Sequence, residues 1–128
     1  MMTSVAGAML AVSLLFPSPQ AYFVHLINHY SGLYKINKKT ALDIAWCESR
    51  LTNVPSDYKT EDSYGVYQLG SEFWIRHAQR FGLPEDPLLR KSPEANISLA
   101  LRVASIDGFK EWACKNKIKN YYYTGQYD

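Results

Sequence analysis

Strong net charge is the first property that this sequence lacks. Its 128 residues carry 14 Lys and Arg against 12 Asp and Glu, which leaves a formal charge of +2. The basic residues form no long cluster, because Lys35, Lys38 and Lys39 make only a short patch. Proteins that bind nucleic acid usually gather Lys and Arg on one face or element. We therefore expect no nucleic-acid partner.

Charged side chains are missing altogether from the first 21 residues. Within them, Val5–Phe16 is an almost unbroken apolar run. It has the length of a secretory signal core and is too short to cross a bilayer comfortably. We interpret residues 1–21 as a signal peptide or membrane anchor, with a truncated or helical start as the alternative because no Lys or Arg precedes the run. Residues 22–128 are then one domain, expected to be monomeric and exported to the periplasm, the cell envelope or the exterior.

Cysteine is scarce, with two in the whole chain. Cys47 and Cys114 are separated by most of the domain, so a disulfide in an oxidising compartment would close a long loop and stabilise the fold. Two buried thiols are the alternative, since free Cys packs as a small hydrophobic residue. The sequence leaves both states open.

Several patterns of catalytic or metal chemistry are also absent. Ser49 is not embedded in a G-x-S-x-G elbow, and His25 with His29 lacks a third zinc ligand. The acidic loop after residue 52 lacks the Gly and terminal Glu of a calcium-binding EF-hand. We expect no metal and no cofactor.

Helical patterns dominate what is present. Apolar spacing, caps and stop signals predict helices near 21–30 with Gly32 as the stop, 38–50 capped by Asn37, 71–81 capped by Ser71 and ended by Gly82, 93–107 opened by Ser92-Pro93, and 109–115. Polar residues 52–64 predict a loop or small β excursion, and residues 65–69 a short extended segment. The predicted fold class is mainly α, with this excursion between the second and third helices.

Glu48 is the most unusual charged residue, because it ends the largely apolar second helix. The negative end of the helix dipole and the neighbouring Trp46 both disfavour its ionised form and raise its pKa. Pairing with Arg50 would have the opposite effect, and the sequence does not say where that guanidinium points. A carboxyl that stays protonated near neutral pH can act as a general acid.

Three short motifs follow one another in an order that resembles the lytic transglycosylase branch of the lysozyme-like superfamily. They are Glu48-Ser49 at a helix end, Gly65–Leu69 (GVYQL) where the family has a Gly-Leu-Met-Gln-Ile-type strand, and Asn96-Ile97 at the start of a helix. The resemblance covers roughly residues 22–114.

The chain also departs from that family. Many members carry an Ala-Tyr-Asn-Ala-Gly segment near the end, which supplies an active-site Tyr, and this segment is absent here. The Trp112–Cys114 stretch looks like a shorter variant, and Tyr121, Tyr122 and Tyr123 are the candidates for replacing the missing Tyr.

The resemblance implies a lysozyme-like helical domain that cleaves peptidoglycan strands between N-acetylmuramic acid and N-acetylglucosamine. Glu48 would act first as acid and then as base, leaving a 1,6-anhydro product without hydrolysis. The implied substrate-binding residues are Ser49, Tyr64, Gly65, Tyr67, Gln68 and Asn96. Ser49 and Gln68 would contact the sugar or orient Glu48, whereas Tyr64 and Tyr67 either line the groove or pack in the core.

Two alternatives stay open. If Asp57, Glu61 or Asp62 positions a water opposite Glu48, the enzyme is an inverting hydrolase similar to goose-type lysozyme. The domain could instead bind peptidoglycan without cleaving it. Cell-envelope or membrane machinery is a further expected partner, and the sequence does not distinguish wall remodelling, secretion or conjugation, and attack on another cell.

Overall fold

The computed structural model describes residues 15–57 and 61–128. Its elements follow in the order α2 (Pro19–Tyr34), α3 (Lys38–Ser49), β1 (Ser63–Tyr64), β2 (Leu69–Gly70), α4 (Ser71–Phe81), the 3₁₀ helix η1 (Pro87–Lys91), α5 (Pro93–Asp107) and the 3₁₀ helix η2 (Ala113–Asn116). The predicted mainly helical fold with a small β excursion is confirmed.

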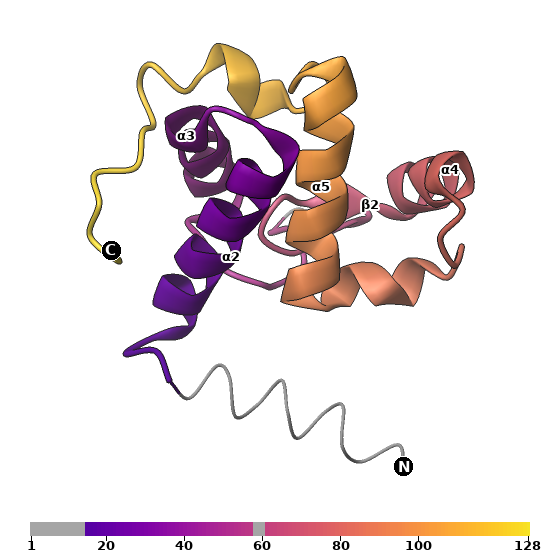
Figure 1. Cartoon of the computed structure of the whole chain (residues 1–128), viewed down its shortest axis with the longest axis horizontal. Helices are drawn as coiled ribbons and strands as arrows, with labels where there is room; N and C mark the ends of the chain where they lie inside the picture. The colour runs from indigo at the N-terminus through magenta and orange to yellow at the C-terminus, as the bar shows by residue number, and fades with distance from the viewer. Residues whose placement is uncertain (1–14, 58–60) are drawn as a thin grey trace.

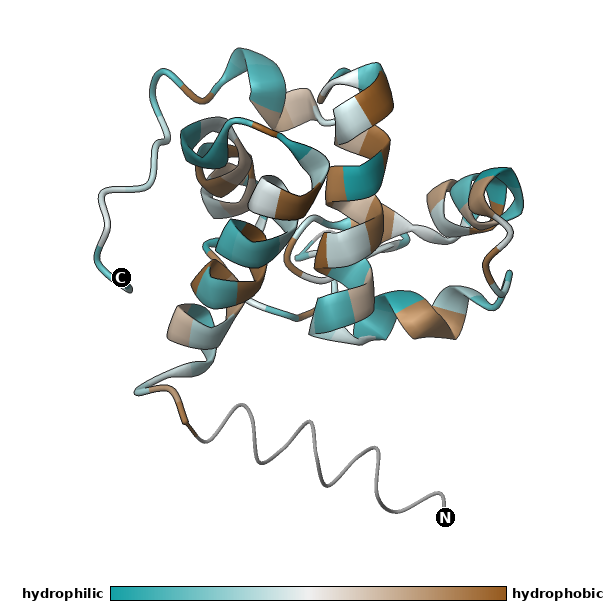
Figure 2. Ribbon diagram, in the orientation of Figure 1, coloured by the Kyte–Doolittle hydropathy of each residue, from teal (hydrophilic) through white to brown (hydrophobic). Residues whose placement is uncertain are grey.

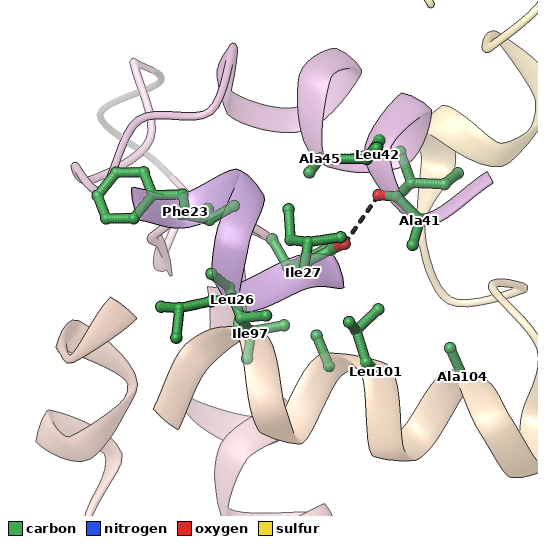
Figure 3. Close-up of a cluster of buried hydrophobic side chains, with 14 of the residues drawn as sticks. Phe23, Leu26, Ile27, Ala41, Leu42, Ala45, Ile97, Leu101 and Ala104 are labelled. Atoms are coloured by element: carbon green, nitrogen blue, oxygen red, sulfur yellow. Dashed lines mark hydrogen bonds between the residues drawn. The ribbon is translucent and has the colours of Figure 1, made fainter. Parts of the chain in front are cut away.

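The core lies where α2, α3 and α5 meet. α2 runs beside α5 and also packs against α3 (Figure 1). Figure 3 shows buried apolar side chains from all three helices converging, namely Phe23, Leu26 and Ile27 from α2, Ala41, Leu42 and Ala45 from α3, and Ile97, Leu101 and Ala104 from α5. Each helix also carries hydrophilic residues (Figure 2), as expected for amphipathic helices around one core.

Local capping explains most helix ends. The side chain of Asn37 accepts a hydrogen bond from the Thr40 N–H at the start of α3, and Ser92 caps α5 in the same way ahead of Pro93. Gly82 ends α4 in the left-handed conformation, as predicted.

Two of the predicted end signals are wrong. Gly32 lies inside α2, and the helix ends instead at Lys35, whose φ is 58°. Ser71 is the first residue of α4 rather than its cap, because Gly70 holds the cap position. Both helices still lie where their apolar patterns predicted them, because burial of an apolar face stabilises a helix more than any single stop signal does.

The segment predicted to be extended over 65–69 is a turn, except for its last residue, Leu69, which lies in β2. β1 and β2 pair antiparallel, with Ser63 opposite Gly70 and Tyr64 opposite Leu69, and residues 65–68 form the tight turn between them. Gln68 takes a positive φ of 50° in this turn. The pattern of small, apolar and polar residues at 65–68 therefore belongs to a turn between two short strands, and not to a strand.

The predicted last helix over 109–115 is replaced by a turn followed by η2. Cys114 of η2 forms a disulfide with Cys47 of α3. After η2 the chain runs back past α3 (Figure 1), where the backbone N–H of Tyr123 donates to Asp43. The C-terminal segment is thus attached to α3 at two places.

The predicted leader overlaps the folded part. Residues 1–14 lie outside the described residues, but Ser18 caps α2 and Ala21 is buried in its first turn. Among residues 15–57 and 61–128, no helix is both long and apolar enough to traverse a bilayer.

Candidate active site

Glu48 lies in the last turn of α3 and is half-buried. It forms part of the wall of an open cavity of about 940 Å³, which we call the Glu48 cavity. Ser49 and Gln68, two of the residues predicted to accompany it, line the same cavity. The end of α3, with Glu48 and Ser49, is thus brought together with Gln68, which lies about 20 residues further along the chain.

The surroundings of Glu48 raise its pKa to about 7. Burial is the main cause, because removing the carboxylate from water penalises its charged form, and the negative charge of Glu61 acts in the same direction. The backbone N–H of Cys114 and the positive charge of Lys117 partly oppose the shift. The carboxyl therefore holds a proton over much of the range below neutral pH, as general acid catalysis requires.

Arg50 does not pair with Glu48. Its Nη1 donates to the carbonyl oxygens of Trp46 at 2.6 Å and Cys47 at 3.4 Å, at the negative end of α3. The guanidinium also lies over the rings of Trp46 and Tyr121. The alternative in which Arg50 lowers the pKa of Glu48 is therefore wrong.

Ser49 uses its hydroxyl group within the protein. Its Oγ donates to the carbonyl oxygen of Val66 at 2.8 Å and accepts from the Thr52 N–H at 3.3 Å. These bonds join the end of α3 to the β1–β2 turn. Ser49 thus fixes the position of Glu48 relative to that turn, which fits the predicted orienting role better than direct sugar binding.

Tyr67 was predicted to line a groove, and this prediction is wrong. Its side chain is 0% exposed, and its hydroxyl donates to the Ala41 carbonyl oxygen at 2.8 Å, the bond drawn as a dashed line in Figure 3. Its backbone oxygen accepts a hydrogen bond from the Trp112 indole at 2.9 Å. A large aromatic ring with a satisfied hydroxyl gains more from the core than from solvent, so Tyr67 anchors the turn.

Asn96 and Gly65 were predicted to contact substrate, and neither does. Asn96 is 0% exposed; its Oδ1 accepts from the Tyr67 N–H, and its Nδ2 donates to the carbonyl oxygens of Tyr64 and Arg90. Gly65 has a φ of +89°, and a Cβ there would lie 2.3 Å from the Asn96 amide. Only glycine allows this close approach, so both residues build the scaffold beneath the cavity.

Tyr64 also lies apart from the site. It is half-buried in β1 and is not among the residues that line the Glu48 cavity, and Lys91 lies over its ring at 5.5 Å. Its ring therefore lies outside the lining of the Glu48 cavity, and its substrate contact stays a prediction.

Gln68 is placed to face a ligand. Its Nε2 donates to the carbonyl oxygens of Val54 at 3.1 Å and Gly65 at 2.9 Å. These two bonds fix the carboxamide at the cavity wall and use both amide hydrogens. The remaining polar atom, Oε1, can accept a hydrogen bond from a ligand in the cavity.

The three loop carboxylates have different surroundings. Asp57 and Glu61 line the Glu48 cavity. Asp62 instead accepts hydrogen bonds from Ser71 and Arg90, which lower its pKa. Asp62 therefore holds the loop to the start of α4, and only Asp57 and Glu61 remain candidates for a second catalytic carboxylate.

Several cavity residues were missed by sequence reasoning, among them Phe73, Trp112 and Lys117. Trp112 and Lys117 flank Cys114, which the disulfide holds next to Glu48. Pairing the two cysteines was the signal that would have placed this segment in the site. Of the three candidate tyrosines, Tyr121 lines the cavity; Tyr122 is exposed outside it and Tyr123 is buried against α3.

A metal site receives little support from the described residues. Among them, His77, Asp107 and Glu111 form the one cluster with metal-ligand spacing. Arg80 bonds both oxygens of Asp107, and Arg76 pairs with Glu111. These arginines already neutralise the carboxylates that a cation would need. His25 and His29 are exposed on α2 and contact the rings of Phe16 and Tyr30, respectively.

Comparison with known protein families, curated proteins and solved structures finds no match to this chain. The function is therefore argued from the chemistry of the Glu48 cavity.

Proposed function

We propose that the protein cleaves the glycan strands of peptidoglycan between N-acetylmuramic acid and N-acetylglucosamine, by lytic transglycosylation. The observation that carries the proposal is Glu48, a half-buried carboxyl without an ion-pair partner among the described residues, with a pKa of about 7 at the wall of an open cavity. The resemblance of the three motifs to lytic transglycosylases agrees with it.

One carboxyl is sufficient for this reaction. Glu48 donates its proton to the glycosidic oxygen as the bond from that oxygen to C1 of N-acetylmuramic acid breaks. The resulting carboxylate then accepts the proton of the C6 hydroxyl of the same sugar, and the C6 oxygen bonds to C1. A 1,6-anhydro ring closes, no water is consumed, and Glu48 recovers its proton.

Glu48 suits both steps because its pKa lies close to neutral. A pKa of about 7 leaves the carboxyl acidic enough to donate and its conjugate base strong enough to accept. The Oε1 of Gln68 provides an acceptor at the same wall, while the Ser49 bond to Val66 keeps Glu48 and the turn in register. Export is part of the proposal, since this substrate lies outside the cytoplasm.

Hydrolysis is a second candidate because Glu61 lines the cavity and its charge acts on Glu48. An inverting hydrolase needs a second carboxylate that activates water on the opposite face of the sugar, about 6.5–9.5 Å from the acid. Glu61 or Asp57 would fill that role.

Digestion of purified peptidoglycan separates these possibilities. Wild type, Glu48→Gln and Glu85→Gln are compared, and the released muropeptides are analysed by mass spectrometry. Glu85 is an exposed carboxylate outside the cavity and serves as the matched control. We expect products lighter by one water than hydrolytic muropeptides, from wild type and Glu85→Gln alone.

Other products would change the assignment. Hydrated reducing ends that disappear in Glu61→Gln or Asp57→Asn would establish hydrolysis. Cleavage that does not depend on Glu48 would reject this active site. Retention on insoluble peptidoglycan without any product would assign a binding module.

A further inference from the structure

Arg50 differs from the other arginines near the site in having no acidic partner among residues 15–57 and 61–128. Arg76, which lines the same cavity, is paired with Glu111. Arg50 also lines the cavity, although Glu48 and several other carboxylates surround the same space. Its positive charge is therefore available to a negatively charged ligand that enters the cavity.

The guanidinium of Arg50 is held in one place. Its Nη1 is fixed on the carbonyl oxygens that end α3, and its Cζ lies 5.3 Å from the centroid of the Trp46 ring and 5.4 Å from that of the Tyr121 ring. A guanidinium has five N–H donors in a rigid fork. With one nitrogen fixed on the helix, the others stay available, and little side-chain entropy is lost when they bind an anion.

Lys117 supplies a second positive charge to the cavity. It follows Cys114, which the disulfide holds against α3, and its charge acts on Glu48. Within the described part of the chain, no carboxylate forms a salt bridge with Lys117. Arg50 and Lys117 thus come from the two segments that the disulfide joins, and both line the cavity that contains Glu48.

We propose that Arg50 and Lys117 form a subsite for an anionic group that is covalently attached to the glycan strand. This inference rests on the proposed function and specifies its substrate as a substituted strand rather than a bare one. The sugar on which Glu48 acts carries a lactyl-linked peptide with carboxylates, and some strands also carry phosphodiester-linked polymers. Both groups offer the oxygen pairs that a guanidinium binds bidentately.

The test measures kcat/KM on soluble, uncross-linked strands in three forms: intact, freed of peptides by an amidase, and freed of phosphodiester polymers by hydrogen fluoride. Wild type should cleave intact strands about tenfold faster than strands without the recognised anion, the size expected for a partly exposed charge-assisted contact. The form that loses this advantage identifies the anion.

Variants show whether the cavity cations cause the preference. Arg50→Gln and Lys117→Gln should each reduce it, and they change separate segments, so a local folding defect in one leaves the other informative. Arg102→Gln and Lys115→Gln are the matched controls, because Arg102 also stacks on a ring and Lys115 lies on η2, just before Lys117, yet neither lines the cavity. Both controls should keep the full preference.

The ratio of kcat/KM between intact and stripped strands cancels any effect of a variant on Glu48 itself. Equal cleavage of all three substrates by wild type, or a preference unchanged in both cavity variants, would overturn the subsite while leaving the proposed function intact. Absence of Glu48-dependent cleavage on every substrate would instead reject the proposed function.

Discussion

Helix α3 carries two acidic residues, and their surroundings differ sharply. Asp43, near its middle, is only 4% exposed, whereas Glu48, at its end, is half-buried. Asp43 accepts hydrogen bonds from the Lys39 Nζ at 2.7 Å and from the Tyr123 N–H at 2.9 Å. Glu48 has a backbone N–H, that of Cys114, and no ion pair within the described residues.

Asp43 is more buried than Glu48 but has partners on both oxygens, so burial alone does not identify a candidate catalytic acid. A buried carboxylate with a cation and a hydrogen-bond donor on its two oxygens is a structural element. A partly buried carboxylate without a cation keeps its proton more tightly and remains open to a substrate. Asp43 attaches the C-terminal segment to α3, whereas Glu48 remains available to a ligand in the cavity.

The largest predicted effect tests this contrast directly. Glu48→Gln removes the transferable proton and should lower kcat/KM on peptidoglycan about a thousandfold, within the usual range for a general acid. Asp43→Asn loses the charge that pairs with Lys39 and should lower the free energy of unfolding by about 1 kcal/mol while cleavage persists. Steady-state kinetics and urea denaturation measure the two quantities. A large loss of cleavage in folded Asp43→Asn would break the contrast.

A second prediction concerns the scaffold under the turn. Asn96→Ala removes the partner of three backbone groups, on Tyr67, Tyr64 and Arg90, and leaves them unsatisfied in the core. The free energy of unfolding should fall by about 3 kcal/mol, measured by urea denaturation. Asn116→Ala, on an exposed turn of η2, should cost almost nothing. If Asn96 bound substrate instead, KM would rise with stability unchanged.

Glu48 also makes the stability of the protein depend on pH. Its pKa rises from the usual 4.5 to about 7 on folding, so the folded state binds the proton more tightly than the unfolded state does. Stability therefore falls as the pH rises between these two values. Relative to wild type, Glu48→Gln should gain about 1–2 kcal/mol between about pH 4 and pH 8, after allowance for solvent screening of a partly exposed group.

Thermal or urea denaturation at several pH values measures this gain. Glu85→Gln, an exposed control, should track wild type throughout. A Glu48→Gln curve parallel to wild type would show that folding does not raise the pKa of Glu48.

The features that could be predicted from the sequence are those whose signals lie within one short segment. Helix ends are one such feature, because a cap residue acts on its own helix. The predicted caps Asn37, Ser92 and Gly82 are all confirmed. The unusual position of Glu48 was equally local, since a helix end and apolar neighbours are read along one segment. The main helices and the unusual surroundings of Glu48 could therefore be predicted from the sequence.

The roles of the residues predicted to surround Glu48 were harder to predict from the sequence, because they depend on contacts across the fold. Tyr67 and Asn96 belong to motifs that accompany the site, but a motif does not say whether a side chain faces the cavity or supports it. Tyr121 and Lys117 reach the cavity through the disulfide, which the sequence left open.

The smallest predicted effect sharpens the comparison at the level of single charges. Lys117 lowers the pKa of Glu48 and Glu61 raises it, each through its charge and from the same cavity. Lys117→Gln should therefore shift the alkaline limb of the kcat/KM profile a few tenths of a pH unit upward, and Glu61→Gln a similar distance downward. Lys115→Gln, outside the cavity, should leave the limb in place. Because these charges are partly exposed, both shifts should shrink as salt is added.

Shifts in the same direction for both variants would mean that something other than Glu48 titrates in the alkaline limb. A loss of the limb in Glu61→Gln alone would assign it to the second carboxylate of a hydrolase.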